Sequence, residues 1–397
     1  MPTHISKSDL DMKIRKIRFL FFSIILIILT FYVSSCKKQT PSTKINPQDN
    51  AYYFIQNLLT YDLETQLKKF PDILNYDYFI PPKKSLVGHY LKLLTLAKVF
   101  WVESIFLMIE GKKEKSLELI VSNYHLGSLL MQSNTIDQVI GIAVNYIAAK
   151  NLEIYALNCC ETQEDFLYLW KAMEELNAQV RKPHIWEWYY LRKPISYFDQ
   201  AKEVKTRHKV SMAKFQLVRL ATAVKYYLVE NGKFPQESKD FVLLSSEKSP
   251  LDPFSSKPLK FISHSDSMIC YSIGPDKADD FAQISYDSTN GTISRGDIIV
   301  KIPKEREFPF PRDGVKASSA EEFRKLFPNG LPDDPFANYR NVPLSITNST
   351  PVYVYSYGPD TDQGRIKQIG DSYIPTVHYD PTNGTTSDGD LFITIPQ

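Results

Sequence analysis

The chain has 397 residues, of which 43% are hydrophobic and 23% are charged, so it is long enough for two or three domains and too apolar to be disordered as a whole. Its formal net charge is only +2, and its many Tyr and Phe residues are not interleaved with basic clusters. This balance argues against a basic nucleic-acid-binding surface, and we expect no nucleic-acid partner.

The N-terminus combines three segments of different composition. Basic residues precede an apolar run from Phe19 to Val33, and small residues follow it up to Cys36. This order predicts a secretory signal peptide over residues 1–35, because the apolar run is shorter than the ~20 residues of a membrane-spanning helix. Met12 gives a more typical signal than the first residue, so we expect translation to begin there.

The segment Val33-Ser34-Ser35-Cys36 resembles the lipobox of bacterial lipoproteins. The resemblance implies cleavage before Cys36 and acylation of this residue, for example by palmitate, so that the lipid holds the protein on a membrane. An uncleaved signal anchor is the alternative. Either arrangement puts the rest of the chain in the cell envelope, facing the periplasm or the exterior, with residues 36–50 as a flexible tether.

Three further cysteines remain once Cys36 is acylated: Cys159, Cys160 and Cys270. Adjacent cysteines on a helix point to different sides and cannot easily bond to each other. An odd and sparse set also argues against a disulfide framework. We therefore predict buried free thiols.

Residues 51–213 contain little glycine and carry apolar residues at spacings of three and four, which predicts a helical domain. The expected helices cover Leu91 to Ile109, Leu117 to Met131, Thr135 to about Cys160, and a segment from Thr162 onwards. Short connections between long helices favour antiparallel neighbours, hence a hairpin array or bundle. One more helix is expected from Lys214, and Gly232 ends it.

Short alternating runs separated by Pro, Gly, Asp and Asn follow this helix and predict strands. Three phrases occur twice in the same order, at 249–259, 271–276 and 286–303, and again at 330–344, 355–360 and 379–396. This indicates a duplication. We name residues 214–304 the first repeat and residues 305–397 the second repeat. The fold class is therefore α+β, a helical domain followed by two helix-plus-antiparallel-sheet modules.

The second repeat has only a short expected lead helix, around Ala320 to Phe327. Without a long helix of its own, its sheet needs other apolar surface to cover it. We expect it to lean on the first repeat.

The phrases AVKYYLVENGKFP, LDPFSSKPLKF, YSIGPDKADD and RGDIIV together resemble the globular part of the type II secretion major pseudopilin. The resemblance covers residues 214–303, and the strand part only over 321–396. It implies a long helix packed on an antiparallel sheet, a link to secretion or pilus-type machinery, and a calcium loop. The prepilin signal and the membrane-helix glutamate of that family are absent from the expected positions, which indicates a reused module rather than a pilus subunit.

Aspartates are the candidate calcium ligands, because calcium prefers several carboxylate oxygens in a turn-rich loop. They are Asp276, Asp279, Asp280 and Asp297 in the first repeat, and Asp360, Asp362, Asp388 and Asp390 in the second. By resemblance, Asp276 and Asp360 match the YS-x-G-x-D aspartate of the family, while Asp297 and Asp390 match its later acidic position. The alternative is that these aspartates serve only as turn residues. Calcium is the one cofactor that the pattern suggests.

No catalytic motif is present, and the histidines stand singly. His125, amid leucines, is expected to be a core histidine. We therefore expect a noncatalytic, lipid-anchored structural or interaction component with an envelope protein partner. One alternative is a lipoprotein that binds a small molecule or a carbohydrate in a cleft lined by Trp186, Trp188 and Tyr189. A divergent hydrolase is the third hypothesis.

Overall fold

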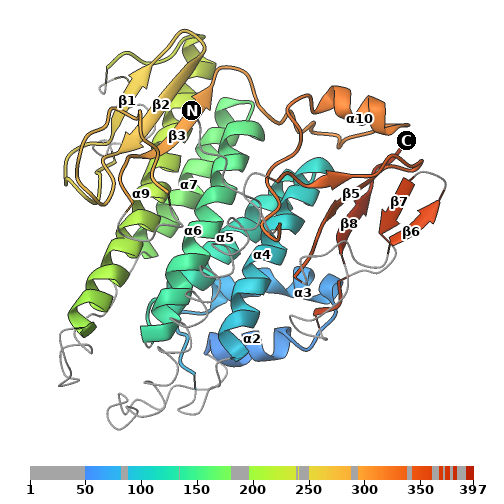
Figure 1. The fold of residues 1–397 in the computed structure, drawn as a ribbon, viewed down its shortest axis with the longest axis horizontal. Coiled ribbons are helices and arrows are strands. Elements are labelled where there is room, and N and C mark those ends of the chain that lie inside the picture. The colour runs from blue at the N-terminus through green and yellow to red at the C-terminus, as the bar shows by residue number, and fades with distance from the viewer. Residues whose placement is uncertain are drawn as a thin grey trace, which may run out of the picture.

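The computed structural model describes residues 50–81, 88–133, 135–179, 196–237, 240, 250–287, 294–337, 342–359, 366–369, 372–375, 379–381 and 390–397. A helical region is followed by two small three-stranded antiparallel sheets, so the fold is α+β as predicted (Figure 1). The predicted signal peptide and Cys36 lie outside the described residues. Among the residues that are described, no helix is both long and apolar enough to cross a membrane.

The helices, in chain order, are α2 (Ala51–Leu58), α3 (Leu63–Lys69), the 3-10 helix η2 (Phe70–Asn75), α4 (Gly88–Ile109), α5 (Lys113–Leu130), α6 (Thr135–Asn158), α7 (Gln163–Gln179), α9 (Ser196–Asn231) and α10 (Ala320–Leu326). Three residues join α4 to α5, and these two helices pack against each other, whereas α7, which follows α6 after four residues, packs on α5 and α9. The predicted helices of this region and the short α10 are confirmed, with ends that differ by a few residues.

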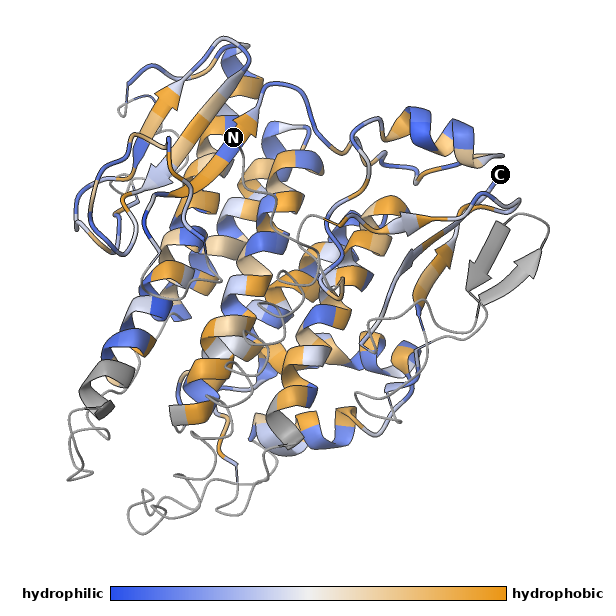
Figure 2. Cartoon of the chain, viewed as in Figure 1, coloured by the Kyte–Doolittle hydropathy of each residue, from blue (hydrophilic) through white to orange (hydrophobic). Residues whose placement is uncertain are grey.

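Helix α9 is the exception, because it begins at Ser196 and not at Lys214 as predicted. Hydrophilic residues prevail on its N-terminal part (Figure 2), where Glu203 and Arg207 form an ion pair at 2.7 Å. The apolar stripe that marked the predicted start appears only where α9 meets the rest of the protein. Periodicity therefore located the strongly apolar part of the helix and missed its more polar beginning, where Val204 and Val210 are buried and most other described side chains are half-buried.

The helical core is built mainly from apolar side chains, among which buried polar groups such as Asn123 and Asn151 form hydrogen bonds. In α4, Val99, Val102 and Ile105 are fully buried, and in α5 the ring of Tyr124 lies 4.7 Å from that of Phe215 on α9, measured between centroids. Each such side chain stabilises the fold by about 1.5–3 kcal/mol relative to an exposed one. Helix α4 is apolar on nearly every side, as expected for a helix in the middle of a bundle, and it packs against both α5 and α6.

The first sheet has the order β1 (Lys260–Ser263), β2 (Ser267–Ser272) and β3 (Ile298–Pro303). Its strands pair antiparallel, with Cys270 opposite Phe261 on one side and Val300 on the other. The C-terminal half of α9 covers the inner face of this sheet. A separate core forms there, and includes Leu217, Leu220, Val224, Met268, Cys270, Val300 and Ile302.

The second sheet has the order β4 (Ser345–Ile346), β5 (Tyr353–Ser356) and β8 (Leu391–Thr394), and a hairpin, β6 (Ile366–Ile369) with β7 (Ser372–Pro375), accompanies it. This sheet packs on α4, and its buried Val354 and Leu391 belong to the same core as the helical region. The prediction that the second repeat leans on the first is therefore wrong. The seven-residue α10 is too short to cover a sheet, and α4 supplies the missing apolar surface.

The two sheets consequently flank the helical region, the first beside α9 and the second beside α4 (Figure 1). Each sheet has one long helix behind it. In the first repeat that helix directly precedes the sheet in the chain, whereas the second sheet uses one from the N-terminal half.

Candidate functional site

A buried aspartate anchors each repeat. Asp252, in the first DPF phrase, is 2% exposed, and its Oδ1 accepts hydrogen bonds from the Phe254 amide at 2.9 Å and the Ser272 hydroxyl at 2.8 Å. Its Oδ2 accepts from the Ile273 amide at 3.3 Å. The carboxylate thus ties the DPF turn to the end of β2, where the loop of candidate ligands begins.

Asp334 repeats this arrangement in the second DPF phrase. It is 5% exposed and accepts from the Phe336 amide at 2.9 Å, the Ser356 hydroxyl at 2.7 Å and the Tyr357 amide at 2.9 Å. Burial raises the pKa of Asp334, and these donors, together with the charge of Lys98, oppose the shift. The same set of bonds at the same sequence phrases is a structural match between the repeats.

Asp276 follows the first anchor and closes the loop across its base. Its Oδ2 accepts a hydrogen bond from the Gly296 amide at 3.1 Å, and its Oδ1 accepts from the Ala278 amide at 3.2 Å. The nearby Gly274 has φ +67°, and a Cβ there would lie 2.3 Å from the Gly296 carbonyl oxygen. Glycine is therefore required where the two strands of the loop come together.

Asp279 and Asp280 lie on the outer part of the same loop. Asp279 forms an ion pair with Lys260 of β1, and its Oδ1 accepts from the Phe281 amide at 3.3 Å. Partial burial opposes ionisation of Asp279, but the hydrogen bond and charge of Lys260 outweigh it and lower the pKa. Phe281 is 63% exposed and adopts φ +53°, so the loop presents a ring to solvent.

Asp297 is the innermost member of the group. It is fully buried, its Oδ2 accepts from the Ala282 amide at 2.8 Å, and its Oδ1 has no hydrogen-bond partner in the described part of the chain. Burial, followed by the charges of Asp279, Asp280 and Asp276, raises the pKa of Asp297 to about 6. A buried carboxylate oxygen without a donor is costly and is suited to a cation.

The four carboxylates surround one loop but do not all point to one centre. In the described residues, no three His, Cys, Asp or Glu side chains converge closely enough to hold a metal ion. Asp276 and Asp279 bond to backbone amides or Lys260, which leaves Asp297 as the carboxylate best suited to a cation. Calcium binding by this set stays a prediction, and it requires Asp279 to exchange Lys260 for the ion.

In the second repeat only Asp390 of the predicted ligands is described; Asp360, Asp362 and Asp388 lie outside the described residues. Asp390 is 2% exposed, and its carbonyl oxygen accepts from the Tyr379 amide at 3.0 Å. Asp297 accepts from the Tyr286 amide in the same way at 2.8 Å. The two later acidic positions are therefore structurally equivalent.

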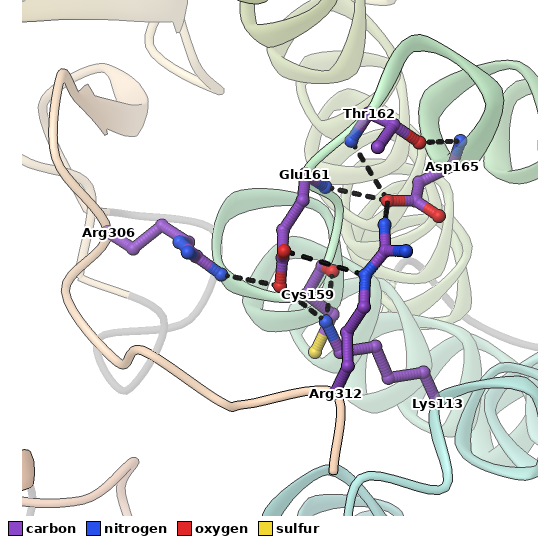
Figure 3. A network of polar contacts seen from close by, with 7 residues as sticks. All are labelled: Lys113, Cys159, Glu161, Thr162, Asp165, Arg306 and Arg312. Carbon is purple, nitrogen blue, oxygen red and sulfur yellow. Dashed lines mark hydrogen bonds and ion pairs between the residues drawn. The ribbon is translucent and has the colours of Figure 1, made fainter.

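A second polar cluster joins the helical region to the linker between the repeats (Figure 3). Glu161 accepts from Lys113 at 2.8 Å and from Arg306 at 2.9 Å, and Arg312 lies 3.5 Å from its other oxygen. Partial burial opposes ionisation of Glu161, but Lys113 and Arg306 outweigh it and lower the pKa. Asp165 extends this cluster. We name the cluster of Lys113, Glu161, Asp165, Arg306 and Arg312 the linker clasp.

Asp165 has two tasks in the linker clasp. It pairs with Arg312 at 3.0 Å and accepts from the amides of Glu161 and Thr162, both at 2.9 Å. The amide of Asp165 donates back to the Thr162 hydroxyl at 3.3 Å. This reciprocal pair is a capping box, and it opens α7.

The cysteines and His125 behave as expected for structural residues. Cys159, Cys160 and Cys270 are buried and free, as predicted, and burial raises the pKa of Cys159 to about 12. His125 is buried, with Nδ1 2.6 Å from Gln179 Oε1 and Nε2 2.9 Å from the Tyr76 carbonyl oxygen. Trp186, Trp188 and Tyr189 lie outside the described residues.

Sequence reasoning missed the two anchoring aspartates. Each DPF phrase also places a buried phenylalanine, Phe254 or Phe336, two residues after its aspartate, but the phrase alone does not mark the aspartate as buried. The signal that could have identified Asp252 and Asp334 was their repetition together with the serine of each YS-x-G phrase.

Comparison of the chain with models of protein families, with curated proteins and with solved structures found no match.

Proposed function

We propose that this chain is a noncatalytic, lipid-anchored protein of the cell envelope that acts as a structural or interaction component. The signal-like N-terminus and the lipobox-like segment ending in Cys36 support the anchor. The buried, protonated thiols and the bonded His125 support a noncatalytic role for the residues concerned. The partner is another envelope protein.

The observation that carries this proposal is the duplicated anchor of Asp252 with Ser272 and Asp334 with Ser356. Both anchors fix a loop at the end of a small sheet, and each sheet keeps an edge strand, β1 or β4, that no further strand covers among the described residues. Edges and loops of this kind are suited to protein contacts. Two such surfaces on one body suit a component that connects neighbours.

We also propose that the two repeats are pseudopilin-like modules and that the protein works beside secretion or pilus-type machinery. The packing of α9 on the first sheet, through Leu217, Leu220 and Val224, supports this for the first repeat. The second repeat keeps the sheet and replaces the long helix by α4. This departure favours a fixed scaffold over a subunit that polymerises through its own helix.

Calcium binding to the loop of Asp276, Asp279, Asp280 and Asp297 is part of the proposal. The unpartnered oxygen of Asp297 supports it, since a bound cation would satisfy that oxygen and favour the charged carboxylate. Calcium would then fix the loop that carries the exposed Phe281.

The test combines lipid labelling with contact mapping in intact envelopes. Labelled palmitate should enter the full chain and not the Cys36→Ser variant. A photo-crosslinking side chain at Phe281, which is 63% exposed, should capture one envelope protein, and chelator should reduce the yield. The matched control is the same group at Tyr168 on α7, which is 60% exposed.

Recovery of an unlabelled wild-type chain from cytosol would refute the anchor. Equal capture of many proteins from both positions would refute a specific contact at the first repeat.

A further inference from the structure

An open cavity of about 800 Å³ lies at the N-terminal helices. It is formed by α2, the end of α3, η2 and the segment that follows η2. Its lining comprises Phe54, Asn57, Leu58, Tyr61, Lys69, Asp72, Asn75, Tyr76, Asp77 and Tyr78. The volume lies within the range of sites for small ligands. None of these residues belongs to the aspartate loops or to the linker clasp.

Aromatic rings form much of the wall. The rings of Phe54 and Tyr76 lie 5.0 Å apart between centroids, and Tyr78 is 49% exposed beside them. Flat rings that remain accessible offer apolar faces, and tyrosine adds a hydroxyl at its edge. Such a wall suits a ligand with both C–H faces and hydroxyl groups.

Planar polar side chains complete the cavity. The side-chain Nδ2 of Asn57 donates to the Tyr61 hydroxyl oxygen at 3.1 Å, which leaves the Tyr61 hydroxyl proton and the side-chain Oδ1 of Asn57 for a ligand. Asp72, Asn75 and Asp77 are exposed, and their side chains form no hydrogen bond within the described structure. Together they supply donors and acceptors in the mixture that hydroxyl groups require.

The charges around the cavity disfavour an ionic ligand of either sign. Lys69 Nζ lies 4.0 Å above the centre of the Tyr61 ring, and its hydrogen bond lowers the pKa of Tyr61. The lysine therefore takes the place that a cationic ligand would use on that ring. Asp72 and Asp77 repel an anion. A neutral ligand is therefore the kind of ligand that meets no like charge in this cavity.

The wall is held in place before any ligand binds. Asn50 fastens the chain after the cavity, since its Oδ1 accepts from the Ile80 amide at 3.0 Å and its Nδ2 donates to the Ile80 carbonyl oxygen at 2.8 Å. His125 contacts the Tyr76 carbonyl oxygen from behind, at 2.9 Å. A preformed wall lowers the entropy cost of binding.

From these contacts we infer that the cavity of Tyr61, Tyr76 and Tyr78 is a binding site for a short neutral oligosaccharide. The sugar rings would lie against the tyrosine faces, and their hydroxyl groups would bond to Asn57, Asp72, Asn75 and Asp77. This site goes beyond the proposed function and does not depend on the lipid anchor or on calcium.

The test is calorimetric titration of the chain from Lys37 onwards with neutral tetrasaccharides at millimolar concentration: chitotetraose, cellotetraose and maltotetraose. At least one should bind, and Tyr78→Ala should weaken it by about tenfold through loss of one aromatic face. Asp72→Asn with Asp77→Asn should weaken it while leaving the melting temperature unchanged. Tyr168→Ala, which removes an equally exposed tyrosine of α7, should bind as the wild type does.

Absence of binding by all three tetrasaccharides to the folded chain would overturn the inference, as would an equal loss in Tyr168→Ala. A parallel titration with vesicles of phosphatidylethanolamine and phosphatidylglycerol separates sugar recognition from membrane contact. If only the vesicles bind, and Tyr78→Ala abolishes this, the cavity is a membrane-facing surface and the inference is wrong.

Discussion

The hydroxyl of Ser272 donates a 2.8 Å hydrogen bond to the buried carboxylate of Asp252, and the loop of aspartates begins directly after it. Ser356 and Asp334 make the same bond at 2.7 Å in the second repeat. The carboxylate in each case also accepts two backbone amides, so its removal leaves buried donors without a partner.

Asp252→Asn should therefore reduce the free energy of unfolding by about 1–3 kcal/mol, since an amide replaces one acceptor with a donor. Asp334→Asn should lose a similar amount, measured by urea unfolding. The control is Asp313→Asn at an exposed position, which should stay within about 0.5 kcal/mol of the wild type. A loss in only one of the two repeats would contradict their structural equivalence.

Asp297 should make stability depend on pH. Its pKa is about 6 in the folded chain, against 3.8 for an ordinary aspartate, so the folded state binds the proton more tightly. The free energy of unfolding should therefore fall as pH rises from about 4 to about 6, by up to about 3 kcal/mol. Asp297→Asn should remove this component and be more stable than the wild type at pH 7 in chelator. If Asp297→Asn and the wild type showed the same dependence of stability on pH, Asp297 would not be the group responsible.

At neutral pH, calcium should restore the stability that is lost when Asp297 ionises. An ion bound to Asp297 stabilises only the folded chain, by about 1.4 kcal/mol when free calcium is about ten times Kd. The melting temperature at pH 7 should rise with calcium and fall with chelator, and Asp297→Asn should respond to neither. Asp313→Asn should respond as the wild type does. A wild-type chain indifferent to calcium would leave the four aspartates as turn residues.

Gly111 marks the place where the end of α4 meets the linker. It has φ +77°, and a Cβ there would lie 2.4 Å from the Arg312 carbonyl oxygen and 2.5 Å from the Gly314 amide nitrogen. Gly111→Ala should combine backbone strain with a clash. Gly232 is the matched control, because its φ is +69° and nothing lies within 4 Å of its Cβ position.

We expect Gly232→Ala to cost about 1–2 kcal/mol and Gly111→Ala to cost clearly more, with faster proteolysis of the linker. Equal losses in urea unfolding would show that the linker moves aside freely.

The linker clasp should add only modestly to the free energy of unfolding, and this contribution should fall as the salt concentration rises. Glu161→Gln leaves Lys113, Arg306 and Arg312 without their shared carboxylate, and should cost about 1 kcal/mol at low salt. High salt should remove most of the difference in urea unfolding. Glu321→Gln is the control, because its pair with Lys325 is largely exposed and should contribute almost nothing. A cost for Glu161→Gln that salt does not alter would point to packing.

The sequence was a good guide where apolar residues recur at helical spacing and where a phrase is repeated. The apolar spacing in 91–109 and 163–179 located α4 and α7, and the repeated phrases identified two strand-built units. It failed at the start of α9, because the polar, half-buried first part of that helix carries no continuous apolar stripe. Repetition of DPF and YS-x-G was visible, but the bond between Asp252 and Ser272 depends on a fold that brings them together.

Local sequence patterns could not predict which helix packs on the second sheet, for a similar reason. Helix α4 is apolar nearly all round, and spacing does not tell which of its sides meets α5 and which meets β8. The cavity at Tyr61 and Tyr78 was missed because its aromatic residues come from two short helices and the turn after them. The sequence instead suggested a cleft at Trp186 and Trp188, because these aromatic residues lie close together in the chain.

The packing of β8 on α4 has a consequence for how the protein is made. Helix α4 ends at Ile109, while β8 begins at Leu391, so this helix obtains part of its covering from a strand far along the chain. Until β8 has been synthesised, the side of α4 that it covers lacks this native neighbour, and contacts so distant along the chain form slowly. Premature termination in the second repeat should therefore leave an apolar side of α4 exposed, and the fragments should aggregate instead of folding into a smaller functional protein.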